Sequence, residues 1–137
     1  MFRVSSVLLI ALAMAGAACD DNPNAPSPAQ TQGTWSGTFE SSNYQSRAVQ
    51  VTLTQADTSI NGSWSGGDWS GSITGTVDGN RASGTVTIRM PALVGECESS
   101  SAFGGNASST TMTWSITRFE GQCDTPPAGA RFVIQRR

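Results

Sequence analysis

The chain has 137 residues, a length that suits one domain, with 8 basic residues, all arginine, against 10 acidic ones and no histidine. A net charge of −2 gives no clustered basic face for nucleic acid, and the lack of histidine excludes Ser-His and Cys-His nucleophile pairs and the commonest zinc ligand. We therefore expect no nucleic-acid partner, no metal and no cofactor.

The N-terminus is typical of an export signal. Arg3 precedes the apolar run Val7–Ala15, which is too short to span a bilayer as a helix. The sequence GAAC at Gly16–Cys19 resembles the lipobox of bacterial lipoproteins, although Gly16 stands where that motif most often has leucine. The resemblance implies a signal peptide over residues 1–18 and a lipid-acylated (palmitate-bearing) Cys19. Cleavage after Ala17 or Ala18, which would release a soluble secreted protein, is the alternative.

The cysteine count favours the anchored form. In an oxidising compartment Cys97 and Cys123 can form a disulfide, which leaves Cys19 as the odd one of three cysteines. The proline-rich segment Asp20–Gln32 has no apolar pattern, so residues 19–32 are expected to form the lipidated cysteine and a flexible tether of up to roughly 40 Å. We expect a protein of the bacterial cell envelope whose partner is the membrane, bound through the lipid.

From Gly33 onward apolar and polar residues alternate, which indicates half-buried antiparallel strands. Strands are expected near residues 33–40, 46–55, 58–65, 69–78, 81–90, 109–119 and 130–136, with a weaker one within 97–106. About eight strands with one apolar face should close into an all-β, antiparallel, up-and-down barrel, because closure removes the exposed edges. The barrel domain would cover residues 33–137, and an open sandwich is the alternative.

In such a barrel the connections alternate between two ends. The tight turns at 56–57 and 79–80 would lie at the end where the tether enters. The opposite end would hold the connections at 41–45, 66–68, 91–98 and 120–129. Cys97 and Cys123 fall in two of these last four, so the topology brings the two disulfide partners together.

The sequence GTWSGTF at Gly33–Phe39 resembles the G-x-W start of the first strand in lipocalins and avidins, the calycin-like barrels. The resemblance implies that Trp35 closes the lower end of the barrel, with Arg136 of the last strand stacked on it. The avidin biotin pocket does not follow, because Ser36 and Gly37 replace its ureido-binding groups. The chain is also similar to short exported bacterial proteins with GTWSGT, VTLTQ and INGSW segments, and that resemblance implies no activity.

The alternation also predicts which side chains face inward. They are Trp35, Phe39, Val49, Val51, Leu53, Ile60, Trp64, Trp69, Ile73, Val77, Val86, Ile88, Met90, Trp114, Ile116, Phe132 and Ile134. They would either fill the barrel or leave a cavity. A cavity is favoured by inward glycines that would leave space empty, namely Gly37, Gly62, Gly71, Gly75 and Gly84. Its mouth would hold an apolar small molecule between Trp64, Trp69, Met90, Trp114 and the rim residue Tyr44.

Two arginines near the same end, Arg47 and Arg118, fall on the inward parity. They would bind a ligand carboxylate or phosphate, or form ordinary ion pairs at the rim. The acidic residues there are Asp68, Glu96, Glu98, Glu120 and Asp124. A non-catalytic binding or structural role is the main expectation, and a glycosidase-like hydrolase that uses these mouth carboxylates is the alternative.

Overall fold

The strands of this protein follow the alternation of its sequence. A computed structural model describes residues 27–137, so the predicted signal peptide, Cys19 and most of the tether lie outside the described residues. The strands are β1 (Gly33–Glu40), β2 (Arg47–Ala56), β3 (Ser59–Gly66), β4 (Trp69–Asp78), β5 (Arg81–Pro91), β6 (Glu96–Ala107), β7 (Thr111–Ile116), β8 (Glu120–Gly121) and β9 (Arg131–Arg136). They include the weak strand expected within 97–106, which is the longest of all.

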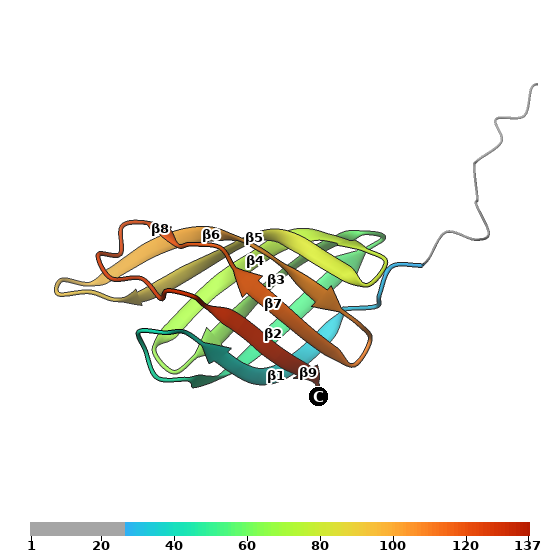
Figure 1. Cartoon of the computed structure of the whole chain (residues 1–137), viewed down its shortest axis with the longest axis horizontal. Coiled ribbons are helices and arrows are strands. Elements are labelled where there is room, and N and C mark those ends of the chain that lie inside the picture. The colour runs from blue at the N-terminus through green and yellow to red at the C-terminus, as the bar shows by residue number, and fades with distance from the viewer. Residues whose placement is uncertain (1–26) are drawn as a thin grey trace, which may run out of the picture.

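All strand pairs are antiparallel and the sheet closes on itself (Figure 1). Each strand from β1 to β6 pairs with the next, β7 pairs with β9, and β9 pairs with β1. The two-residue strand β8 pairs with Ser99 and Ser100 of β6. The prediction of an all-β, up-and-down barrel of eight strands is thereby confirmed, and the open sandwich is not formed. The architecture is compatible with a calycin-like fold.

The inside of the barrel is apolar and packed. Every apolar side chain that the alternation placed inward is buried, and Trp35, Trp114 and Phe132 are at most 1% exposed. The outer face carries Ser and Thr at the alternate positions, for example on β4, where Ser72, Thr74 and Thr76 are exposed. Because the barrel interior excludes water, this apolar filling is the main source of its stability.

One end of the barrel, here called the tether pole, holds residues 27–32 and the turns after β2, β4 and β6 (right in Figure 1). The ring of Trp35 is fully buried there, and its indole N–H donates to the carbonyl of Thr31. The guanidinium of Arg136 lies 4.5 Å from the centre of that ring. It also donates to the carbonyls of Gln30, Gln32 and Ser109. The stacking that the G-x-W resemblance implied is present.

The last residues of the expected tether belong to this closure. The Ala29 amide donates to the Gly79 carbonyl. Thr31 is fully buried, and both its amide and its hydroxyl donate hydrogen bonds to the side-chain oxygen of Gln55. The segment Ala29–Gln32 is therefore fixed across the barrel end and is not a free linker. Sequence patterning missed this because the segment is polar and contacts the barrel chiefly through hydrogen bonds.

The opposite end, the loop pole, holds the longer connections (left in Figure 1). The wall there is incomplete, because β7 ends at Ile116 while its neighbour β6 begins much nearer the loop pole, at Glu96. The gap is covered by the wall loop, which we define as Thr117–Ala130 and which includes β8. This irregular segment replaces the last three residues of the strand expected over 109–119.

Candidate functional site

The aromatic residues predicted to line a ligand mouth instead form a packed cluster below the loop pole. Phe39 stacks on Trp64 with 5.5 Å between ring centres, and it meets Trp69 and Phe132 edge to face. Trp64 and Trp69 are only 2% and 3% exposed. Trp114 is 1% exposed and packs with Phe103 and Phe132. The tryptophan faces that a ligand would need are covered by other rings and, at Trp69, by the Arg47 guanidinium.

The inward glycines do not leave empty space, contrary to the expectation behind the cavity. A Cβ on Gly37 would lie 2.0 Å from the Val133 carbonyl oxygen, and one on Gly71 would lie 1.8 Å from that of Thr87. The same kind of clash, with a carbonyl oxygen of the neighbouring strand, is found at Gly62, Gly75 and Gly84. These glycines allow neighbouring backbones to approach closely in a strongly coiled barrel, which is a recognised use of glycine within strands.

The Trp64 side chain lies beside the close approach of Gly71 to Thr87. Its indole N–H donates to the carbonyl of Thr87, on β5, at 2.9 Å. The ladder between β4 and β5 is interrupted beside this point, where the Ser72 amide bonds to the Thr87 hydroxyl in place of a carbonyl. The indole N–H of Trp64 is thus already hydrogen-bonded within the barrel wall and is not available to a ligand.

Three predicted site residues meet at the rim. The guanidinium of Arg47 lies 3.5 Å from the ring centre of Trp69, and Tyr44 contacts the same ring edge to face at 5.0 Å. Arg47 also donates to the Gly66 carbonyl and pairs with Asp68 at 3.1 Å. The rim ion pair, one of the two roles expected for this arginine, is present.

The remaining candidates do not join this group. Arg118 was expected to face inward but is exposed, because β7 ends two residues earlier and the alternation shifts so that Phe119 is the buried residue. Met90 lies at the end of β5 and is 7% exposed. The predicted ligand set is therefore divided between the core, the rim and the outer surface.

The mouth carboxylates lie on the outside of the barrel, where Glu98 and Glu120 line one hollow of about 290 Å³. Glu96 and Glu98 project from the outer face of β6, where both pair with Arg89 of β5. Their side chains are 62% and 50% exposed, and Asp68 is held by Arg47 elsewhere on the rim. Within residues 27–137 no three Cys, Asp or Glu side chains form a cluster that could hold a metal ion.

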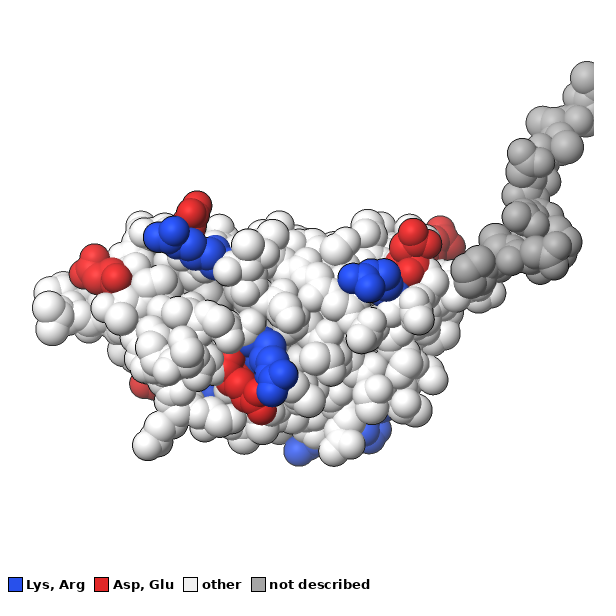
Figure 2. Space-filling view, in the orientation of Figure 1, with Lys and Arg blue, Asp and Glu red and all other residues white. Residues whose placement is uncertain are grey.

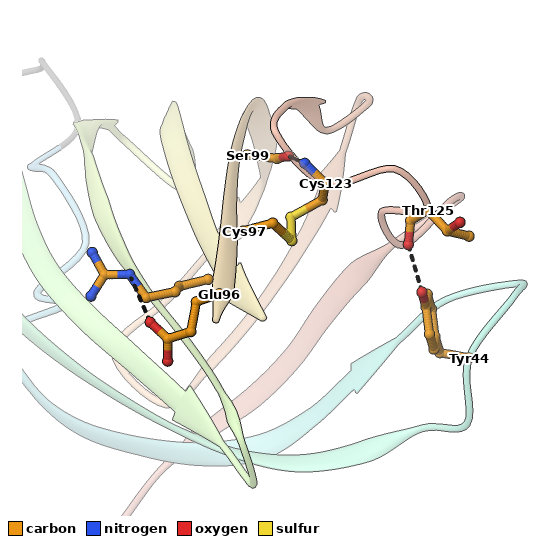
Figure 3. The surroundings of a disulfide bond; sticks show 7 residues. Tyr44, Glu96, Cys97, Ser99, Cys123 and Thr125 are labelled. Carbon is orange, nitrogen blue, oxygen red and sulfur yellow. Dashed lines mark hydrogen bonds and ion pairs between the residues drawn. A yellow bond between two sulfur atoms is a disulfide. The ribbon is translucent and has the colours of Figure 1, made fainter. Parts of the chain in front are cut away.

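A disulfide fastens the wall loop to β6, as the cysteine positions predicted. Cys97 and Cys123 are bonded, with 5.0 Å between their Cα atoms (Figure 3). The Ser99 hydroxyl accepts from the Cys123 amide and that of Ser101 accepts from the Arg118 amide. On the other side the Tyr44 hydroxyl donates to the Thr125 carbonyl. The wall loop is thus held by one covalent bond and by polar groups from both neighbouring segments.

The most unusual surface feature is the tip of the hairpin between β5 and β6. Leu93 is 105% exposed and Val94 is 91% exposed, whereas the next large apolar side chain among residues 27–137, Val133, is only 38% exposed. The hairpin projects beyond the other loops at the far left of Figure 1, and its outermost part is uncharged in Figure 2, with an acidic side chain close behind it. We call residues Pro91–Gly95 the apolar tip.

A groove lies beside the apolar tip. It has a volume of about 520 Å³, and Tyr44, Met90, Leu93, Val94 and Thr125 are among the residues that line it. A second hollow, of about 630 Å³, is formed by the wall loop itself. Sequence reasoning missed the apolar tip because it treated 91–98 only as a connection. The signal was present, since two aliphatic residues between Pro91 and Gly95 occupy a place where turns are normally polar.

Comparison with known proteins finds no matching family model, no similar curated protein and no similar solved structure. The part of the chain from residue 27 onward contains no helix of the length and apolar character needed to cross a membrane. The fold and its surface therefore supply the argument for function.

Proposed function

We propose that this protein is a bacterial envelope lipoprotein, anchored through an acylated Cys19, and that its barrel is a non-catalytic scaffold that presents the loop pole to a binding partner. The observation that carries the binding role is the apolar tip, because soluble surfaces rarely expose two adjacent aliphatic side chains almost completely without a use for them. The anchor rests on the export signal, the lipobox resemblance and the odd cysteine.

The positions of the two ends support this role. The described chain enters the barrel at the tether pole, where Ala29 is bonded to Gly79, and the apolar tip lies at the other pole. A lipid on Cys19 would hold the tether pole near the membrane, within roughly 30 Å for the ten residues from Cys19 to Pro28 if they are extended. The loop pole would then be the part of the molecule most accessible to a partner.

The role expected for the tryptophan-lined mouth is less well supported than a role for the outer surface. An apolar small molecule would have to displace Trp64, Trp69 or Phe39 from a packed cluster. A carboxylate-dependent hydrolase, the other alternative, would need two acids facing one substrate site. Glu96 and Glu98 instead project to the outside and are paired with Arg89.

Mass spectrometry of the protein purified from envelopes tests the anchor. We expect an N-terminal Cys19 that carries acyl chains, and a Cys19→Ser variant that leaves the membrane fraction. An intact unmodified chain that starts at Ala18 or Cys19 would contradict the anchor.

Site-specific photocrosslinking tests the binding surface. A benzoylphenylalanine probe in place of Leu93 should crosslink to a macromolecule in intact envelopes. The matched control is the same probe in place of Val133, which is exposed on β9 and remote from the apolar tip. Equal crosslinking at both positions, or none at Leu93, would contradict a binding role for the loop pole.

A further inference from the structure

The groove beside the apolar tip is apolar in most of its lining but holds one carboxylate. The hairpin between β5 and β6 contributes Met90, Leu93 and Val94 to it, the loop between β1 and β2 contributes Tyr44, and the wall loop contributes Asp124. Asp124 is the only charged residue of this lining, and it belongs to none of the ion pairs formed within residues 27–137. Such a groove suits a cationic group on an aliphatic stem, because the methylenes can be buried while the charge is paired.

The charges behind the apolar tip have the same sign. The guanidinium of Arg89 lies 3.7 Å from the carboxylate of Glu96 and 3.2 Å from that of Glu98, so one arginine faces two glutamates and an excess of one negative charge remains. Asp124 adds a second, and an acidic side chain is visible close behind the tip in Figure 2. This potential disfavours anionic lipid headgroups and an identical acidic pole, and it favours a partner that carries positive charge.

We propose that the loop pole binds a polypeptide partner that presents a lysine or arginine beside an apolar side chain. The basic side chain lies in the groove, where Met90 and Val94 contact its methylene stem and Asp124 pairs with its charged end. Leu93, at the tip, packs on the neighbouring apolar side chain of the partner. With about 520 Å³, the groove has room for both partner side chains. This proposal rests on the proposed function, because it uses the same surface and specifies the chemistry of what binds there.

The groove is preformed, and its aromatic wall suits a cation. The disulfide between Cys97 and Cys123 joins the hairpin to the wall loop, so two sides of the groove are held together covalently (Figure 3). The Tyr44 hydroxyl donates to the Thr125 carbonyl, and the centre of its ring lies 5.0 Å from that of Trp69. A tyrosine ring fixed in this way can add a cation–π contact to the ion pair, and a rigid groove loses little conformational entropy on binding.

A nuclear magnetic resonance titration of the Cys19→Ser chain lacking its signal peptide tests this chemistry. The probes are two capped pentapeptides, one with a lysine between two leucines and one with a glutamate in its place. We expect the lysine peptide to shift the signals of Tyr44 and Thr125 with a dissociation constant of about 1 mM, and the glutamate peptide to shift neither. Asp124→Asn should weaken binding of the lysine peptide about 5-fold. The matched control is Glu120→Gln, which removes a wall-loop carboxylate that does not line the groove and should leave binding unchanged.

Photocrosslinking in envelopes separates this proposal from the proposed function. With the probe in place of Leu93, Asp124→Asn should lower the yield of a protein crosslink severalfold, whereas Glu120→Gln should not. Equal binding of the two peptides, no shifts up to about 10 mM peptide, or a crosslink that Asp124→Asn does not weaken would overturn the basic partner. A crosslink to a glycan or to a second copy of the chain would also overturn it, and would preserve the proposed function. No crosslink from position 93 would defeat both.

Discussion

The two poles of the barrel are closed in different ways. At the tether pole, short turns and one buried tryptophan close the end, and Arg136 joins three separate carbonyls over the ring of Trp35. At the loop pole an irregular segment of 14 residues, 117–130, completes the wall and is fastened by the Cys97–Cys123 disulfide. The regular strands are held by their backbone hydrogen bonds alone. The wall loop makes few such bonds and is fastened by a disulfide instead.

This difference separates stability from function. Residues at the tether pole face inward or bond to the backbone, so changes there should affect folding. The exposed residues at the loop pole, above all Leu93, are free to contact a partner, so changes there should affect binding and leave folding nearly untouched. The following predictions test whether the two poles are as distinct as their construction indicates.

The largest effect is expected for Trp35→Ala. The ring is fully buried, and its loss removes both the hydrogen bond to Thr31 and the surface on which Arg136 lies. We expect a decrease of about 5 kcal/mol in the free energy of unfolding, the upper end for such truncations. The matched variant is Phe119→Ala in the wall loop, where an irregular backbone can partly collapse and the loss should be nearer 3 kcal/mol. Urea denaturation measures both, and equal losses would contradict the contrast.

The next effect is expected for removal of the disulfide by a double Cys97→Ser, Cys123→Ser change. The bond joins residues 26 apart in sequence, and the chain-entropy model gives about 3–4 kcal/mol for such a loop. Hydrogen exchange should show faster opening of amides in 117–129 and little change at the tether pole. Uniformly faster exchange at both poles would show instead that the barrel opens as one unit.

A smaller effect is expected for the two arginines that stack on tryptophan. Arg136→Ala should lower the free energy of unfolding by about 2–3 kcal/mol, because three charge-assisted hydrogen bonds are lost with the stacking. Arg47→Ala should lower it by about 1 kcal/mol, since its ion-pair partner Asp68 is 67% exposed. Thermal denaturation of both variants measures the order, and a reversed order would place the greater contribution at the loop pole.

The smallest effect is expected for Tyr44→Phe. The change removes the hydroxyl that donates to the Thr125 carbonyl but keeps the ring against Trp69. We expect a loss of about 1 kcal/mol, the usual net contribution of one hydrogen bond. Nuclear magnetic resonance should place the shift changes in the wall loop. A Thr38→Val change on the outside of β1 serves as the control and should be nearly neutral.

The barrel could be predicted from the sequence because its wall is built almost entirely from period-two strands. Apart from Arg47 and Gln55, the inward positions of β1 to β5 are apolar residues or glycines, so parity alone identifies the core. β6 was harder to recognise because two of its inward positions are Ser99 and Ser101. These serines face inward to bond the wall loop at Cys123 and Arg118, and nothing in a local pattern indicates a partner so distant in sequence.

The candidate site was less predictable. Parity placed Trp64 and Trp69 correctly near the loop pole, but it could not show that Phe39 and Phe132 would cover them. Parity also failed at Arg118, because the alternation assumes a continuous strand and β7 ends at Ile116. The apolar tip lies outside any strand, so an argument based on strand faces could not find it.

The pairing of β1 with β9 has a consequence for the order in which the protein is made. The first strand of the ring finds its second neighbour only in the last strand to be made, β9, where Trp35 lies opposite Arg136. During synthesis, β1 and whichever strand was completed most recently both present unpaired backbone groups. The ring can be sealed only after β9 has emerged, so a nascent chain, or one truncated before β9, is exposed to edge-to-edge aggregation that the finished barrel cannot undergo.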